Sequence, residues 1–205
     1  MTTLVWEAII LAGGQARRLG GRDKAQLVGP DGRTCLEGII QGCAGAAKRV
    51  VVGPQRRISS VIWTQEEPAF SGPARAIAAG VTALGQDSGA EWVVVLACDM
   101  PYVGQAVAVL LNEAEVLDVC GVEAIVGISE DGRHQWLCAA YRKKALIEAC
   151  ERLPVGGSGE SVRFLIGDLI LSELPVSSAT VEDIDTESDM RMLGFGTEEY
   201  RLVKG

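Results

Sequence analysis

The order of apolar runs and helical patterns limits this chain to an α/β fold more strongly than any other feature of its sequence. Short runs that are apolar throughout or nearly so lie at Val5–Leu11, Arg49–Val52 and Trp92–Ala97. Such runs are typical of strands that are buried on both faces of a sheet. Between them, Thr34–Ala47 and Pro73–Leu84 carry apolar residues at helical spacing. Strands that alternate with helices predict a mainly parallel sheet covered by helices, so the expected fold class is α/β.

The second half of the chain continues this alternation less regularly. A short strand is expected near Ser60–Trp63 in the first half; the later elements are helices over Ala106–Val116, Lys143–Arg152 and Thr186–Leu193 and strands over Val122–Ile128, Gln135–Tyr141 and Thr180–Ile184. No stretch has the composition of a linker, and no internal repeat is visible. We therefore expect residues 1–205 to form a single domain, with a short mobile tail after about residue 195.

Composition excludes several classes of protein. The hydrophobic residues make up 48% of the chain but occur in runs far shorter than a membrane span. A net charge of -8 argues against broad binding of nucleic acid or anionic membranes. The first residues lack a basic leader, so we expect a cytoplasmic protein. Six scattered cysteines and a single histidine argue against a zinc site or a disulfide framework, and we expect the cysteines to be buried, reduced thiols.

The segment after the first predicted strand combines glycines with positive charge. Gly13 and Gly14 follow the strand directly, and four cations come next, at Arg17, Arg18, Arg22 and Lys24. Glycines leave backbone N–H groups free to face an anion, and cations neutralise a polyphosphate. The segment matches neither the dinucleotide-binding glycine motif nor the P-loop of NTPases. The alternative is a structural turn with a solvated basic loop, but such a cluster on an acidic chain favours phosphate binding.

Asp99 is a second candidate for chemistry. It follows the apolar strand Trp92–Ala97, and Pro101 ends the pairing two residues later. Ligands of open α/β sheets bind beyond the carboxyl ends of the strands, so Asp99 should face the same crevice as the glycine loop. A carboxylate beside a polyphosphate is a candidate Mg²⁺ ligand. The alternative is an ordinary helix cap.

Taken in order, these motifs resemble the molybdenum cofactor guanylyltransferases, a family of the nucleotidyltransferase superfamily. The resemblance spans most of the chain and rests on Leu11–Gly14, Arg17–Gly21, Asp23-Lys24, Gly72-Pro73, Cys98–Pro101 and Asp183–Thr186. It implies a single-domain, Rossmann-like nucleotidyltransferase fold. It also implies an enzyme that transfers GMP from GTP to the terminal phosphate of molybdenum-bound molybdopterin, giving molybdopterin guanine dinucleotide and pyrophosphate.

The resemblance also implies roles for individual residues. The nucleotide would be held by Leu11, Ala12, Gly13 and Gly14 through the backbone, by Arg17 or Arg18 at the β- and γ-phosphates, by Lys24 at the α-phosphorus and by a Mg²⁺ ion on Asp99. The catalytic residues would be Lys24, Arg18 and Asp99. Asp185 would be a second metal ligand, although it can equally serve with Thr186 as a helix cap.

Three further residues are expected at the two substrates. Where the family often carries an acidic residue followed by Asp-Pro, this chain has Glu66-Glu67-Pro68, so Glu67 would recognise the nucleoside. His134 and Arg163 would face the molybdopterin acceptor, which other cofactor-biosynthesis proteins would deliver. The alternative for His134, the single histidine of the chain, is an ordinary surface residue.

Other functions remain open. The same fold can serve a cytidylyltransferase for the same pterin, or a guanylyltransferase for another small phosphorylated acceptor. A nucleotide-binding regulatory protein without turnover is an alternative from another class. The presence of both Lys24 and Asp99 favours catalysis, because binding alone has less need of a cation and a metal carboxylate together.

Overall fold

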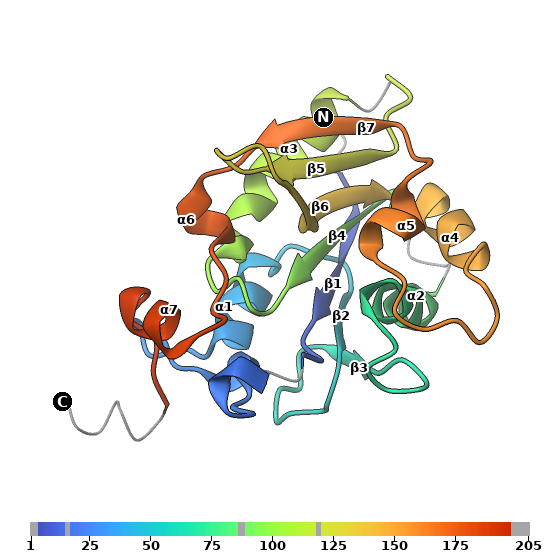
Figure 1. Ribbon diagram of the computed structural model, residues 1–205. Coiled ribbons are helices and arrows are strands. Elements are labelled where there is room, and N and C mark those ends of the chain that lie inside the picture. Colours follow the sequence, from blue (N-terminus) through green and yellow to red (C-terminus); the bar gives the residue numbers. More distant parts are fainter. Residues whose placement is uncertain (1–3, 15–16, 86–88, 118–119, 198–205) are drawn as a thin grey trace.

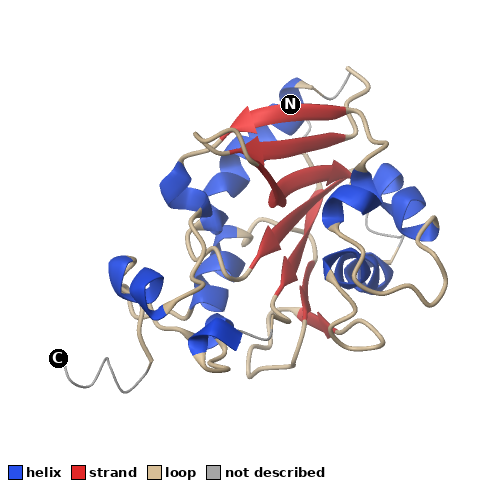
Figure 2. Ribbon diagram, in the orientation of Figure 1, coloured by secondary structure: helices blue, strands red, loops and turns tan. Residues whose placement is uncertain are grey.

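The computed structural model describes residues 4–14, 17–85, 89–117 and 120–197. Its seven strands form one sheet in the order β3-β2-β1-β4-β6-β5-β7. Helices lie on both faces of this sheet, with α1, α3, α6 and α7 on one side and α2, α4 and α5 on the other (Figures 1 and 2). The expectation of an α/β fold is confirmed.

The strands and helices have the following bounds. The strands are β1 (Trp6–Leu11), β2 (Arg49–Val52), β3 (Ile62–Thr64), β4 (Trp92–Ala97), β5 (Ala124–Ile128), β6 (His134–Arg142) and β7 (Leu171–Pro175). The α-helices are α1 (Cys35–Gly42), α2 (Pro73–Leu84), α3 (Val107–Val116), α4 (Lys143–Glu151), α5 (Val162–Ile166), α6 (Ser178–Val181) and α7 (Glu187–Met192). Short 3-10 helices cover η1 (Arg17–Leu19), η2 (Lys24–Gln26) and η3 (Val103–Ala106).

Alternate residues of the central strands pack into two different cores. Ala8 and Ile10 of β1 belong to the cluster under α1 and α3, whereas Ile9 belongs to the cluster under α2 and α4. Both faces of a central strand are therefore apolar, which is why β1 and β4 occur in the sequence as nearly unbroken hydrophobic runs. Helix α1 begins as expected with Thr34 as its N-cap, in a capping box with Glu37, but it ends at Gly42 rather than Ala47.

The sheet is mixed rather than parallel throughout. β1 is parallel to β2 and β4, whereas β6 is antiparallel to both β4 and β5. The reversal follows from the short connection between β5 and β6. Ser129 N donates to Arg133 O over 3.0 Å, and Gly132 has a φ of 81°. A connection this short joins antiparallel neighbours, since parallel strands need a longer crossover.

One expected strand is wrong. Residues 180–184 were expected as a strand, but α6 occupies Ser178–Val181 and the late strand is β7. Val181, the last residue of α6, and Ile184, in the extended segment after it, are both buried, so apolar residues here do not mark a strand. β7 is an edge strand of the sheet whose residues alternate between exposed and half-buried, so its sequence carries a weak hydrophobic signal.

Residues 195 and 196 of the C-terminal segment pack against the rest of the protein. Phe195 is buried, and Gly196 exchanges backbone hydrogen bonds with Val28 of 2.7 and 2.9 Å. The remainder of the expected mobile tail, 198–205, lies outside the described residues. Among the helices that the structure describes, we find none with the length and hydropathy needed to cross a membrane.

The cysteines differ in accessibility, which gives a first prediction. Burial raises the pKa of Cys35, Cys43, Cys138 and Cys150 to about 12, and that of Cys98 well above its usual value. Cys120, however, is exposed, so the expectation that all six thiols are buried is wrong. We expect one fast-reacting thiol when the native protein is treated with iodoacetamide at pH 8, because the thiolate is the reactive form. Mass spectrometry should locate the adduct at Cys120, and a second fast adduct would contradict the assignment.

Candidate nucleotide-binding site

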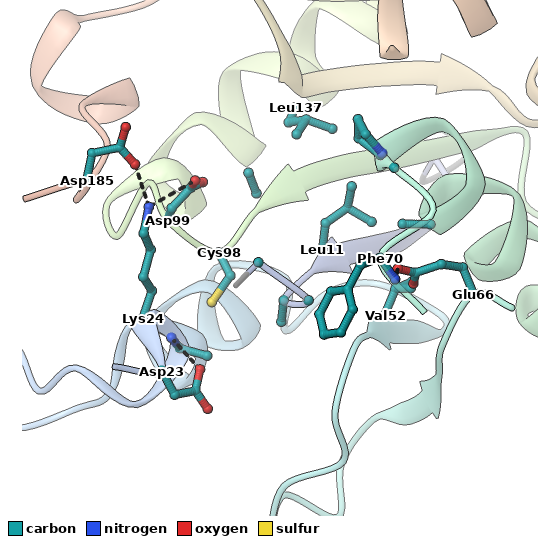
Figure 3. Close-up of a pocket in the computed structure, with 18 of the residues that line it drawn as sticks. Leu11, Asp23, Lys24, Val52, Glu66, Phe70, Cys98, Asp99, Leu137 and Asp185 are labelled. Atoms are coloured by element: carbon teal, nitrogen blue, oxygen red, sulfur yellow. Dashed lines mark hydrogen bonds and ion pairs between the residues drawn. The ribbon is translucent and has the colours of Figure 1, made fainter. Parts of the chain in front are cut away.

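A crevice of about 750 Å³ opens at the carboxyl ends of β1 and β4 (Figure 3). Leu11 and Ala97 are paired in register at the ends of these strands, and Cys98 N donates to Leu11 O over 2.9 Å. The loops that follow the two strands therefore start side by side. This is the position at which ligands bind to open α/β sheets.

Most of the residues proposed for the nucleotide line this crevice. They are Leu11, Ala12, Gly13, Gly14, Arg18, Lys24, Asp99 and Asp185. Arg17 begins η1, but its side chain lies outside the described part of the chain. The sequence thus identified one connected site, although its residues come from segments up to 174 positions apart, from Leu11 to Asp185.

Lys24 lies at the centre of the charged end of the crevice. It begins η2, whose N-cap Asp23 accepts a hydrogen bond from Ala25 N. Lys24 Nζ lies 2.6 Å from Asp185 Oδ1 and 3.6 Å from Asp99 Oδ2, and its side chain is only 15% exposed. Arg18 adds a second ion pair with Asp185 at 3.2 Å. Lys24 and Arg18, two of the cations proposed for phosphate, are therefore both paired with carboxylates.

Three carboxylates form a group that fits a divalent cation. Oxygens of Asp99, Asp183 and Asp185 all lie within 4.8 Å of one another. The groups meet because Ile184 N donates to Asp99 O over 2.8 Å, which fixes the late segment beside the end of β4. Burial, followed by the charges of Asp185 and Asp99, raises the pKa of Asp183. Oxygen donors of this kind suit a hard cation such as Mg²⁺ or Mn²⁺.

Asp185 is held by the start of α7, not by the end of a strand as expected. Thr186 is the N-cap of this helix and forms a capping box with Asp189. Asp189 Oδ2 also accepts from Asp185 N over 3.1 Å. The helix cap is thus Thr186 with Asp189, and Asp185, the candidate ligand, lies directly before it. Asp183 was not proposed as a ligand, although its spacing of two from Asp185 was a usable signal.

Arg56 is an important residue that the sequence did not reveal. Its Nε and one terminal nitrogen donate to the two carboxylate oxygens of Asp23, each over 2.8 Å. The same side chain donates to Ala12 O over 3.2 Å and to Pro54 O over 2.9 Å. It is 11% exposed on the side-chain atoms. Arg56 therefore connects the loop after β2 with the glycine loop and with the cap of the helix that carries Lys24.

The opposite end of the crevice is largely apolar. Leu11, Val52, Phe70 and Ala76 contribute to its lining. The carboxylate there belongs to Glu66, which is buried, whereas Glu67 is exposed and is not among the lining residues. The acidic residue that lines this end of the crevice is thus one place earlier in the chain than the resemblance implied.

The two residues proposed for the acceptor lie outside this crevice. His134 contacts Glu173 over 2.7 Å and stacks on Trp136 with a centroid distance of 4.7 Å. Arg163 is exposed on α5. Leu137, which follows Trp136 on β6, is the residue of this strand that lines the crevice. The geometry gives neither His134 nor Arg163 a contact with the nucleotide crevice.

A glycine loop, a lysine beside three carboxylates and a mixed α/β sheet together define a nucleotidyltransferase of Rossmann-like fold. A model of the MobA-like NTP transferase domain matches residues 8–169. The chain therefore belongs to this family.

Relatives and solved structures agree with this assignment. The chain is 35% identical over 193 residues to a "Probable molybdenum cofactor guanylyltransferase" of Mycobacterium avium, covering 90% of this chain and 93% of the relative. It is 30% identical over 150 residues to a "Molybdenum cofactor guanylyltransferase" of Shewanella sp. strain ANA-3, covering 70% and 71%. The fold resembles the crystal structure of molybdopterin-guanine dinucleotide biosynthesis protein A from Archaeoglobus fulgidus, with a TM-score of 0.69, 19% identity and coverage of 97% and 100%.

Proposed function

We propose that this protein transfers GMP from GTP to the terminal phosphate of molybdenum-bound molybdopterin in the cytoplasm, forming molybdopterin guanine dinucleotide and pyrophosphate. The observation that supports this most strongly is the position of Lys24 Nζ between Asp185 and Asp99, in the same crevice as the glycine loop. The names of the curated relatives support the choice of GTP and of the pterin acceptor.

The reaction is a displacement at the α-phosphorus of GTP. An oxygen of the acceptor phosphate forms a bond to this phosphorus, and the bond to the oxygen bridging the β-phosphate breaks, so pyrophosphate leaves with the electron pair. Lys24 would stabilise the charge that develops on the α-phosphate oxygens. The N–H groups of Gly13 and Gly14 would hold the phosphate chain, since the Ala12 N–H already donates to Val52 O over 2.8 Å, and Arg18 would contact its β- and γ-groups. Positioning and charge neutralisation supply most of what such a transfer needs.

We propose Mg²⁺ as the divalent metal, held by Asp99 and Asp185 and with Asp183 as a further carboxylate. The clustering of their oxygens within 4.8 Å supports this ligand set. When bound, the ion would neutralise phosphate charge and orient the triphosphate. A metal on Asp185 would compete with Lys24 for this carboxylate, and the phosphates offer Lys24 an alternative partner.

Glu66 supports guanine as the base. Its Oε1 accepts from Phe70 N over 2.8 Å. Within the described part of the chain, its Oε2 is buried and has no hydrogen-bond partner. On the Watson–Crick edge of guanine the free Oε2 would meet two neighbouring N–H donors, whereas beside the single amino donor of cytosine it would meet an acceptor. We therefore assign to Glu66 the role that the resemblance gave to Glu67. His134 and Arg163 remain our candidates for the acceptor.

Calorimetric titration with GTP, CTP, ATP and UTP, each with Mg²⁺, tests the proposal. We expect GTP to bind most tightly and Asp99→Ala to weaken that binding at least tenfold. Glu130→Ala is the matched control, because this acidic residue lies outside the crevice. Preference for CTP would replace the proposed product with a cytosine dinucleotide, and binding of no nucleotide would refute the proposed function.

A further inference from the structure

Phe70 has an unusual backbone and an unusual environment. Its φ is 63°, and it is the non-glycine residue with positive φ among those that the structure describes. This left-handed region is unfavourable for a bulky side chain, and such strain is often kept where function requires it. The side chain is also 53% exposed, although it is a large apolar group, and it borders the crevice.

Neighbouring contacts fix the conformation of this segment from both sides. Glu66 Oε1 accepts from Phe70 N over 2.8 Å, and Glu66 is itself only 7% exposed. On the other side, Ser71 is buried and its carbonyl accepts from Gly159 N over 2.7 Å. The strained backbone is therefore imposed by a buried carboxylate and by the loop that precedes α5. Its result is to keep an aromatic ring at the edge of the crevice.

The position of this ring matches one part of a nucleotide. Figure 3 shows Phe70 and Glu66 at the end of the crevice opposite Lys24, Asp99 and Asp185. The charged end suits phosphates and metal, so the apolar end is left for the nucleoside. A planar base needs an apolar surface for its face and polar partners for its edge. Phe70 supplies the first, and the unpartnered Oε2 of Glu66 supplies the second.

We propose that Phe70 packs against the face of the bound nucleobase, and that Glu66 both holds this ring in place through Oε1 and accepts from the edge of the base through Oε2. Phe70 is then a specificity and affinity residue for the nucleoside. This inference rests on the proposed function, since it requires that the crevice binds a nucleotide.

The variant Phe70→Gly tests the contribution of the aromatic ring to binding without disturbing the backbone conformation. Glycine adopts a φ of 63° without strain and keeps the N–H that donates to Glu66. Because base–aromatic contacts contribute substantially to affinity, we expect this change to weaken GTP binding about tenfold or more, while the melting temperature stays equal or rises. Binding of inorganic tripolyphosphate should not change, since it has no base. Phe70→Tyr, which keeps an aromatic ring, should bind GTP with native affinity. Phe164→Ala, which alters an exposed phenylalanine on α5, should also leave the affinity for GTP unchanged.

A second variant reports the contact directly. In Phe70→Trp, GTP is expected to quench the added indole fluorescence relative to the native protein, whereas tripolyphosphate is not. If the native protein binds GTP but Phe70→Gly binds it equally well, or if GTP leaves the indole emission unaffected, the assignment of Phe70 is overturned. If the native protein binds no nucleotide, the proposed function fails, and this inference fails with it.

Discussion

Replacing Lys24 with alanine is expected to slow GMP transfer about 100- to 1000-fold, the usual effect of removing one preorganised charge donor from a reacting oxyanion. Lys24 Nζ lies 2.6 Å from Asp185 and 3.6 Å from Asp99, two of the candidate metal carboxylates, and η2 with its Asp23 cap fixes its position. Because the charge on the α-phosphate oxygens grows only as the reaction proceeds, kcat should fall more than the affinity for GTP. Pyrophosphate release under single-turnover conditions, combined with calorimetry, measures the two effects separately.

Lys144→Ala is the matched control for this experiment. Lys144 lies on α4, its side chain is 90% exposed, and its partner Glu148 is 3.9 Å away. Its removal should leave both transfer and GTP binding unchanged. A Lys24→Ala enzyme with native kcat would show that Lys24 has only a structural role and would remove the central residue from the proposed mechanism.

Gly53→Ala is expected to destabilise the fold, whereas Gly14→Ala is expected to weaken nucleotide binding at native stability. A Cβ on Gly53 would lie 2.7 Å from Ala12 C and 2.9 Å from Gly13 N, and Gly53 has a φ of 143°. Overlap with backbone atoms and an unfavourable φ should together lower the free energy of unfolding by about 3–5 kcal/mol. A Cβ on Gly14 meets no atom within 4 Å, so Gly14→Ala should be as stable as the native protein.

The variant Gly14→Ala is instead expected to change the affinity for GTP. If the phosphates approach the backbone of the glycine loop, the new methyl group of Gly14→Ala occupies their path, and GTP affinity should drop at least tenfold. Urea unfolding and calorimetric titration of both variants test the pair. Native GTP affinity in Gly14→Ala would mean that the nucleotide does not contact this part of the loop.

The sequence predicted those parts of the fold that depend on strong local signals. β4 and α2 have the expected bounds, Trp92–Ala97 and Pro73–Leu84, because the first is apolar throughout and the second begins at a proline after glycine. β7 was missed because a half-exposed edge strand needs little hydrophobicity. The antiparallel insertion of β6 was missed because periodicity carries no information on strand direction.

The residues of the candidate site were likewise predicted where they belong to a recognisable sequence motif. Lys24 and Asp99 follow recognisable motifs, and both lie in the crevice. Arg56 acts through three hydrogen bonds to atoms of other segments, namely Ala12 O and the two oxygens of the Asp23 carboxylate. No pattern in the sequence around Arg56 predicts these contacts. That Glu66 rather than Glu67 lines the crevice has the same origin, since a loop conformation decides which of two neighbouring carboxylates points inward.

The ion pair between Lys24 and Asp185, at 2.6 Å, has a consequence for the order in which ligands arrive. A divalent cation alone meets a lysine already bound to the carboxylate it needs, and a metal-free triphosphate meets a lysine already neutralised. The two together exchange partners with the protein, each releasing the group that the other requires. Free Mg²⁺ and free nucleotide should therefore each bind weakly, and the crevice should bind their complex as a single ligand.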